Sequence, residues 1–133
     1  MVNRLSKKLD FSPYSRGMGA LGLPGDYTSQ SRFVRASFVK LNSPKGKTEE
    51  ECVNRFFHIL DAVFVPEGGC KTEKGKNNKT QYSSCMSADK GIYYYKPLEC
   101  HSLYAVDLNR EDVKGRSLVC YPFQKKSKVI LQN

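Results

Sequence analysis

Cysteine and histidine are the residue types of this sequence most able to act as a nucleophile, a general base or a metal ligand. The 133 residues include five cysteines and two histidines. The cysteines are Cys52, Cys70, Cys85, Cys100 and Cys120. None forms the close pairs of a zinc knuckle or a redox motif, so reduced and partly buried thiols are expected. The sequence also lacks a phosphate-binding loop with its lysine, a serine nucleophile elbow and paired acidic residues at metal-ligand spacing.

Both histidines are weak candidates for catalysis. His58 lies with Asn54 and Asp61 on the polar side of a predicted helix, which favours a solvated surface position. His101 follows Cys100 at the edge of a predicted strand, where neighbouring side chains point to opposite faces. We therefore do not expect Cys100 and His101 to act in one site.

The basic charge of the chain permits an anionic partner. The 22 Lys and Arg residues outnumber the 13 Asp and Glu residues, which gives a formal charge of +9. The excess is spread over the start of the chain, the polar loop 71–79 and the tail 125–128, and it builds no single helix face. A solvated basic surface is the preferred interpretation. A small basic nucleic-acid-binding module that uses the loop and the tail is the alternative.

No stretch is apolar over the length that crosses a bilayer, and the basic first ten residues are not followed by an apolar segment. We expect no membrane association and a cytoplasmic location, which fits reduced thiols.

A glycine-rich loop leads into the first predicted helix. The stretch "YSRGMGALGLPGDYTSQSRFVRASF", residues 14–38, places four glycines and a proline in its first dozen residues, and glycine reaches positive φ without steric cost. Good N-cap residues follow, and a helix is predicted over Ser31–Leu41 and ended by "NSPKGK". The N-cap candidates are Asp26, Thr28 and Ser29. Apolar residues on more than one side of this helix predict burial beyond a narrow stripe.

The second predicted helix has the clearest start. Thr48 and Glu51 have the spacing of a capping box. Apolar residues then recur at intervals of three and four, which predicts one stripe facing a core. They are Val53, Phe56, Phe57, Leu60, Val63 and Phe64. From this pattern we expect Phe56, Phe57 and Leu60 in the core.

Short runs rich in Tyr, Val, Ile and Leu follow, separated by turn residues, and they predict a meander of antiparallel strands. The runs lie at residues 80–86, 91–97, 101–108 and 117–123, and "SADKG" fits a hairpin loop. Residues 92–95 are apolar or aromatic on both faces, which is typical of a sheet that is covered on both sides. Two helices can cover one face, whereas nothing in the sequence supplies a cover for the other.

The glycine-rich stretch resembles the C-terminal portion of the choloylglycine hydrolases, the family of bile salt hydrolases and penicillin V acylases. The resemblance continues through "FVKLNS", "FFHIL", "YSSCMSADKGIYYY" and "AVDLN", in order and with similar spacing, from about Tyr14 to near the end. Several separated blocks agree, which makes the resemblance specific.

The resemblance implies an α+β fold that is part of an N-terminal-nucleophile hydrolase αββα sandwich, with two helices followed by an antiparallel sheet. Residues 1–133 would form a single partial domain, the C-terminal part of that fold. The uncovered sheet face would then pack on a second sheet supplied by sequence outside this chain.

The family's nucleophile is a cysteine that becomes the first residue after processing. This chain begins Met1, Val2, and its internal cysteines have no free α-amine, so the nucleophile is not expected here. The resemblance carries over one active-site residue, Arg32 of the "SRF" motif, in a supporting role. Without the resemblance, Arg32 would be interpreted as a surface helix arginine. No metal or organic cofactor is implied.

The resemblance therefore predicts a C-terminal fragment of a bile salt hydrolase-like amidase that is inactive alone. The parent reaction hydrolyses the amide bond of glycine- or taurine-conjugated bile acids, with penicillin V as the other substrate type. The expected partner is the missing N-terminal half or another subunit, and self-association is expected. A split gene, a truncated remnant and a mis-called start codon all remain open.

Overall fold

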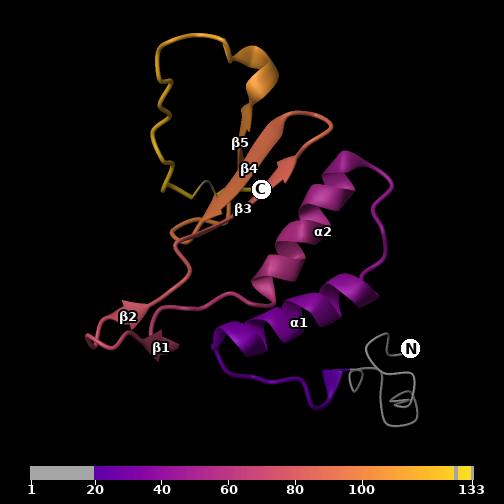
Figure 1. The fold of residues 1–133 in the computed structure, drawn as a ribbon, viewed down its shortest axis with the longest axis vertical. Helices are drawn as coiled ribbons and strands as arrows, with labels where there is room; N and C mark the ends of the chain where they lie inside the picture. The colour runs from indigo at the N-terminus through magenta and orange to yellow at the C-terminus, as the bar shows by residue number, and fades with distance from the viewer. Residues whose placement is uncertain (1–19, 128, 133) are drawn as a thin grey trace. The chain divides into compact units, whose positions relative to one another are not determined.

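The computed structural model describes residues 20–127 and 129–132. The chain divides into two compact units, Met1–Lys79 and Thr80–Asn133. In the described part, the first unit holds two α-helices and a short hairpin, and the second holds a three-stranded sheet (Figure 1). Two compact units can belong to one domain, so the expected single partial domain stays a prediction.

Both predicted helices are present, each with a threonine N-cap. Helix α1 spans Ser29–Asn42, and the Thr28 side chain accepts a hydrogen bond from the Ser31 N–H. Helix α2 spans Glu49–Asp61, and Thr48 accepts from the Glu51 N–H in the same way. The Glu51 carboxylate reaches back to the Lys47 N–H at 2.9 Å. These contacts satisfy N–H groups that a helix start would otherwise leave unpaired.

The core of the first unit lies along α2 and the segment that follows it. Its buried apolar residues are Val53, Phe57, Val63 and Val65. The prediction that Phe56 is in the core is wrong, because its side chain is 42% exposed, and Leu60 is only half-buried. Val53 and Phe57 share one line of the helix at i, i+4, and the neighbouring line with Phe56 and Leu60 lies at the margin of the packed face.

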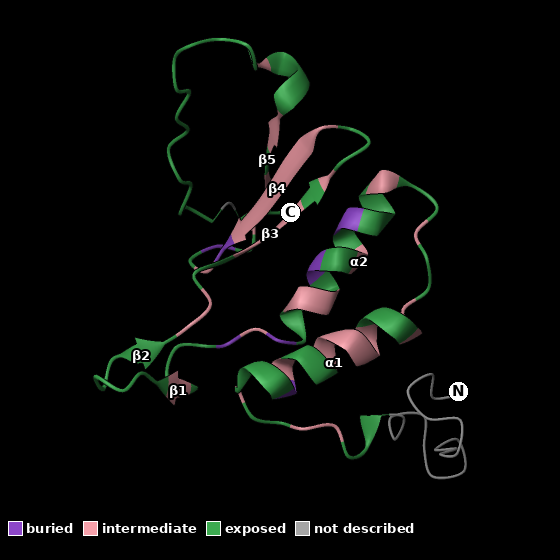
Figure 2. Cartoon of the chain, viewed as in Figure 1, coloured by how far each residue is buried: buried purple, intermediate pink, exposed green. Residues whose placement is uncertain are grey.

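The predicted broad burial of α1 is also wrong. Its one buried residue is Ser31, and Phe33 is 73% exposed. Figure 2 shows most of α1 as exposed or intermediate. The helix that packs against α1 is α2, and a single neighbour covers only one side of a helix.

The polar segment 71–79, predicted as a loop, contains a short hairpin. Strands β1, Cys70–Lys71, and β2, Asn77–Asn78, pair antiparallel. The turn between them is closed by the Thr72 N–H, which donates to the Lys76 carbonyl at 2.8 Å, and by Gly75 at a φ of 76°. Hydrophobic alternation could not indicate this hairpin, because backbone contacts and a positive-φ glycine make it.

The second unit is an antiparallel meander, as predicted. Strands β3, Tyr82–Ser87, β4, Ile92–Pro97, and β5, Tyr104–Asp107, pair in the order β3-β4-β5. The predicted hairpin loop connects β3 and β4, with Gly91 at a φ of 65°. Together with the helices, this confirms an α+β chain with two helices followed by an antiparallel sheet.

One face of the sheet, called here the aromatic face, carries Tyr82, Tyr93, Tyr95 and Tyr104. Phe123, from the irregular segment that follows β5, lies on this face. Its ring stacks on Tyr95 at 5.4 Å and meets Tyr82 edge-on at 6.1 Å. All residues of the central strand β4 except Pro97 remain half-buried (Figure 2). The described part of this unit therefore closes neither face of the sheet.

The predicted fourth strand, residues 117–123, is wrong. The segment is irregular and mostly exposed. A strand needs a neighbour that accepts its ladder hydrogen bonds, and Pro122 has no N–H to donate.

Among the described residues, no helix combines the length and the apolar character needed to cross a membrane.

Candidate functional site

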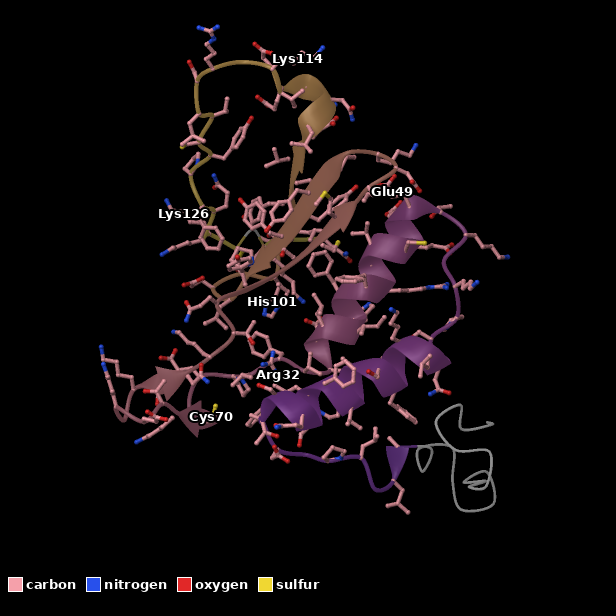
Figure 3. The ribbon with its side chains drawn as sticks, viewed as in Figure 1. Arg32, Glu49, Cys70, His101, Lys114 and Lys126 are labelled. Carbon is pink, nitrogen blue, oxygen red and sulfur yellow. The ribbon has the colours of Figure 1, made fainter. Side chains whose placement is uncertain are left out.

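Arg32, the predicted site residue, lies at the start of α1. Its Nε donates a hydrogen bond to the Val63 carbonyl at 3.0 Å, and the residue is half-buried. Figure 3 shows Arg32 between the start of α1 and the C-terminal end of α2. Arg32 thus has a backbone carbonyl as its partner, while its role in catalysis stays a prediction.

The guanidinium of Arg32 is anchored at one nitrogen. In the part of the chain that the structure describes, its Nη1 and Nη2 groups make no hydrogen bond or ion pair. A hydrogen bond through Nε fixes the plane of the guanidinium. Its Nη1 and Nη2 groups can still donate to a carboxylate or a carbonyl oxygen. This geometry suits a supporting charge that acts on groups outside the described residues.

The turn before α1 carries a fixed negative charge. The Asp26 carboxylate accepts from the Ser31 hydroxyl at 2.6 Å and from the Thr28 N–H at 2.8 Å. These hydrogen bonds, that of Ser31 first, hold the pKa of Asp26 well below its usual value. An ionised carboxylate at this place also interacts favourably with the positive end of the helix dipole.

Arg35, which sequence reasoning missed, joins three segments. Its Nη1 donates to the Pro24 and Asp26 carbonyls, each at 2.7 Å, and its Nε donates to the Ala62 carbonyl at 3.4 Å. Arg32 and Arg35 therefore hold two successive carbonyls at the end of α2. The available signal was the spacing of three residues, which places both arginines on one side of a helix.

The glycine-rich loop is described only in its second half. Gly22 has a φ of 84°, a conformation that glycine adopts without strain, and the Leu23 N–H donates to the Ala20 carbonyl at 3.2 Å. Gly17 and Gly19 lie outside the described residues.

All five cysteines lie in the described part of the chain. All five are free, and Cys100 is buried with its Sγ 3.8 Å from the Tyr104 hydroxyl. Burial raises the pKa of the Cys85 thiol, which favours the less nucleophilic protonated form. His58 is exposed, as predicted, and His101 is exposed as well. No group of three or more His, Cys, Asp or Glu residues within the described ranges could hold a metal ion.

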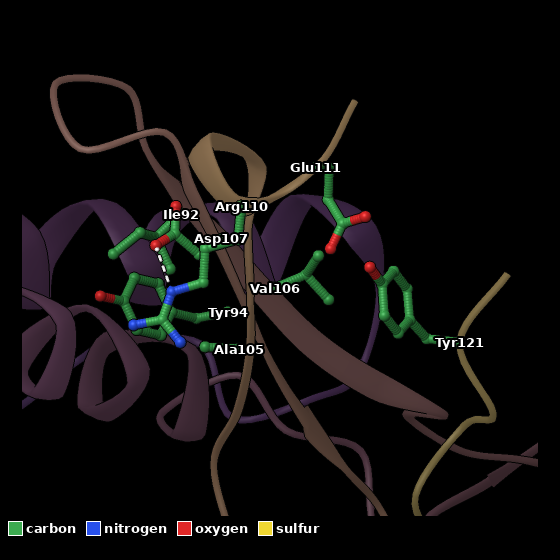
Figure 4. Close-up of a pocket in the computed structure, with 8 residues that line it drawn as sticks. All are labelled: Ile92, Tyr94, Ala105, Val106, Asp107, Arg110, Glu111 and Tyr121. Carbon is green, nitrogen blue, oxygen red and sulfur yellow. Dashed lines mark ion pairs between the residues drawn. The ribbon is translucent and has the colours of Figure 1, made fainter. Parts of the chain in front are cut away.

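A pocket of about 390 Å³ lies along the edge strand β5 (Figure 4). Arg110 lies beside Tyr94 and pairs with Asp107 at 3.3 Å, while Glu111 and Tyr121 face one another. The Asn109 backbone N–H, which donates to Asp107, lowers the pKa of that carboxyl. The hydrogen bond to Glu111 raises the pKa of Tyr121. These shifts keep the Asp107 carboxyl ionised and the Tyr121 hydroxyl protonated near neutral pH. Neither group is therefore prepared to act as a general acid or base.

The basic loop proposed for nucleic-acid binding is partly neutralised. Lys79 pairs with Glu67 at 2.9 Å, and this contact lowers the pKa of Glu67. The nucleic-acid alternative stays a prediction.

Comparison with protein families gives one match that spans most of the chain. The model of the family described as linear amide C-N hydrolases, choloylglycine hydrolase family, matches residues 2–121. A bile salt hydrolase/transferase of Lactiplantibacillus plantarum is 46% identical over 131 residues, which are 98% of this chain and 40% of that protein. A bile salt hydrolase/transferase of Clostridium perfringens is 39% identical over 83% of this chain and 33% of its own length.

Two solved structures with similar folds can be named. A mutant conjugated bile acid hydrolase from Clostridium perfringens superimposes with a TM-score of 0.75 and 36% identity, covering 90% of this chain and 36% of that one. A penicillin V acylase from Agrobacterium tumefaciens superimposes with a TM-score of 0.61 and 24% identity, covering 71% of this chain and 30% of the acylase chain. At this identity the likeness shows the fold alone. The chain thus spans 40% or less of the length of the relatives named here.

Proposed function

Because the chain belongs to the choloylglycine hydrolase family of linear amide C–N hydrolases, we propose that it is the C-terminal part of a bile salt hydrolase-like amidase. The parent reaction is hydrolysis of the amide bond between a bile acid and glycine or taurine. The observation that carries this proposal is the 46% identity to a bile salt hydrolase/transferase along 98% of this chain. Its identity to the penicillin V acylase is lower, so conjugated bile acids are the preferred substrates.

Arg32 has a supporting role in this proposal. Amide hydrolysis needs a nucleophile, a group that takes its proton and stabilisation of the charge that develops on the carbonyl oxygen. Arg32 contributes a permanent positive charge, and its Nε bond to the Val63 carbonyl fixes the plane of the guanidinium. Its terminal nitrogens would contact acidic or carbonyl groups of the N-terminal part, beside the reacting centre.

The partner in this proposal is the N-terminal part of the enzyme or another subunit. Exposed apolar side chains support it, because a cytoplasmic protein buries such a surface against a partner. Examples in the described part are Phe33, 73% exposed on α1, and Met86, 63% exposed on β3. A cytoplasmic location belongs to the same proposal, and the free thiols agree with a reducing compartment.

Complementation tests the proposal. The chain is co-expressed with the N-terminal part of the Lactiplantibacillus plantarum relative, starting at its mature first-residue cysteine, and the two are purified together. Release of glycine or taurine from conjugated bile acids is measured, with penicillin V as a second substrate. Each part alone serves as a control.

Hydrolysis by the pair and by neither part alone is the expected result. A stable pair without turnover on any of these substrates contradicts the proposed activity. Binding of the chain to nucleic acid that weakens steeply with added salt would support the alternative function instead.

A further inference from the structure

The two helices of the first unit begin in the same way. Each has a threonine N-cap, a proline four residues before it and an arginine seven residues after it. The arginine Nη1 donates to the proline carbonyl, at 2.7 Å before α1 and at 2.8 Å before α2. The two sets are Pro24, Thr28 and Arg35, and Pro44, Thr48 and Arg55.

The two arginines differ in what else they contact. Arg55 pairs with Glu51, at 3.5 Å and one turn earlier on its own helix. Arg35 instead reaches the Ala62 carbonyl with Nε, and the Asp26 carbonyl with the same Nη1 that holds Pro24. Among the described residues, Arg55 therefore holds only its own helix and the loop before it, whereas Arg35 also holds the end of another helix.

The Ala62 carbonyl is next along the chain to the carbonyl that orients Arg32. Arg32 donates from Nε to Val63, and Arg35, three residues later on α1, donates from Nε to Ala62. The Ala62 and Val63 carbonyls belong to neighbouring peptide planes that meet at the Val63 Cα, so holding the Ala62 carbonyl leaves only the φ and ψ of Val63 to change the direction of the next one. We propose that Arg35 is the positioning residue of Arg32: it holds the end of α2 and the loop before α1 so that the Val63 carbonyl meets the Arg32 Nε.

The shape of the arginine side chain is essential to this role. A guanidinium donates from Nε and Nη1 along fixed directions in one plane, so it can reach carbonyls of separate segments together. A lysine at position 35 would keep the charge, but its single ammonium could not span both sets of carbonyls. The catalytic importance of Arg32 rests on the proposed function, while the contact between Arg35 and the end of α2 does not.

The first experiment uses the full chain labelled with ¹⁵N-arginine and purified together with the unlabelled N-terminal part, because the isolated chain is expected to associate with itself. Nuclear magnetic resonance follows the Nε–H of Arg32 and its exchange with solvent in the wild type, in Arg35→Gln and in Arg35→Lys. Arg55→Gln is the matched control, because it also removes an arginine that holds a proline carbonyl. We expect the Arg32 Nε–H to shift and to exchange at least about tenfold faster in both Arg35 variants, and to stay unchanged in Arg55→Gln.

Circular dichroism of each variant reports whether the fold persists. An unchanged Arg32 Nε–H in a folded Arg35→Gln overturns the proposal. Loss of the fold in both Arg35 variants also overturns it, because Arg35 would then serve general stability.

The second experiment uses the complemented enzyme. Arg35→Gln should lower kcat at least about tenfold while KM stays within about twofold, and adding Arg32→Ala should cause little further loss. Additive losses would contradict positioning. If Arg32→Ala alone leaves turnover unchanged, the catalytic role of Arg32 fails, and the resonance experiment still decides whether Arg35 positions it.

Discussion

At the scale of single residues, two arginines of α1 show how the same side chain can serve different ends. Among the described residues, Arg35 donates to three backbone carbonyls from Nε and Nη1, whereas Arg32 donates from Nε alone. Arg35 is thus held at both ends of its fork, and its contacts stabilise the fold. Arg32 is anchored at Nε, and both of its terminal nitrogens can donate to another group.

Replacing Arg32 by alanine tests this difference in the complemented enzyme. Turnover should fall at least about tenfold, the loss expected when one charged stabilising group leaves an active site. Arg55→Ala is the control, since the contacts of Arg55 in the described ranges are with its own helix and the loop before it. Wild-type turnover in Arg32→Ala would remove this residue from the active site.

Asp26 gives the turn before α1 a pH-dependent stability. Its pKa in the folded chain lies below the usual 3.8, so the carboxylate stabilises the fold fully above that value and loses this effect as the pH falls further. Asp26→Asn should therefore melt below the wild type near neutral pH, and the two melting temperatures should converge in acid. Asp89→Asn, in the exposed loop between β3 and β4, serves as the control. A difference that persists unchanged in acid would show that the charge of Asp26 is not the cause.

At the scale of elements, two adjacent phenylalanines of α2 differ in burial. Phe57 is 5% exposed and Phe56 is 42% exposed. Phe57→Ala should cost about 3 kcal/mol of unfolding free energy, because it empties a packed site, whereas Phe56→Ala should cost clearly less. His58→Ala, at an exposed position, should be nearly silent. Denaturant unfolding of the three variants measures the differences, and equal losses for both phenylalanines would contradict their difference in burial.

Elements with local signals were predictable, and burial that depends on neighbours was not. The N-cap candidates placed α1 after the glycine-rich loop, and the Thr48 capping box with its apolar periodicity placed α2. The run around Tyr93–Tyr95 with its hairpin loop placed β3 and β4. The exposure of Phe33 and Phe56 depends on which elements pack against each helix. The periodicity of apolar residues does not show this. Segment 117–123 is rich in residues that favour strands but has no strand neighbour in the described part.

The candidate site was predictable only in part. Arg32 was found through the resemblance of the "SRF" motif to a family. The contacts of Arg32 with the Val63 carbonyl and of Arg35 with the Ala62 carbonyl depend on how the end of α2 packs against α1. Residue spacing in the sequence does not predict this packing.

At the scale of the whole molecule, the likeness to the solved hydrolases confirms the expected fold class, part of an N-terminal-nucleophile hydrolase αββα sandwich. In such a sandwich each sheet has a helical layer on one face and a second sheet on the other. This arrangement explains why β4 is apolar or aromatic on both faces yet only half-buried here.

The isolated chain should not hydrolyse conjugated bile acids or penicillin V. Nucleophilic cleavage needs an activated nucleophile beside its base, and Arg32 cannot replace a thiolate. Release of glycine or taurine should stay at the blank level. Clear turnover by the pure chain would contradict this prediction, and Cys-to-Ser variants would then identify the nucleophile.

The isolated chain should also associate with itself. Leu118 is 90% exposed and Ile130 is 85% exposed, and the aromatic face is only partly covered. Size-exclusion chromatography with light scattering should show oligomers or aggregates that diminish when the N-terminal part is added. A monodisperse monomer at all concentrations would contradict the prediction.

The order β3-β4-β5 follows the order of the chain, with short connections between strands. Every ladder contact of this sheet therefore joins residues close in sequence, which keeps the entropy lost on loop closure small and folding fast. The sheet can form before any partner arrives, in the microseconds to milliseconds typical of hairpins and small local folds. The rate of complementation should then depend on protein concentration, as docking of preformed parts does, and not on a slow folding step within this unit.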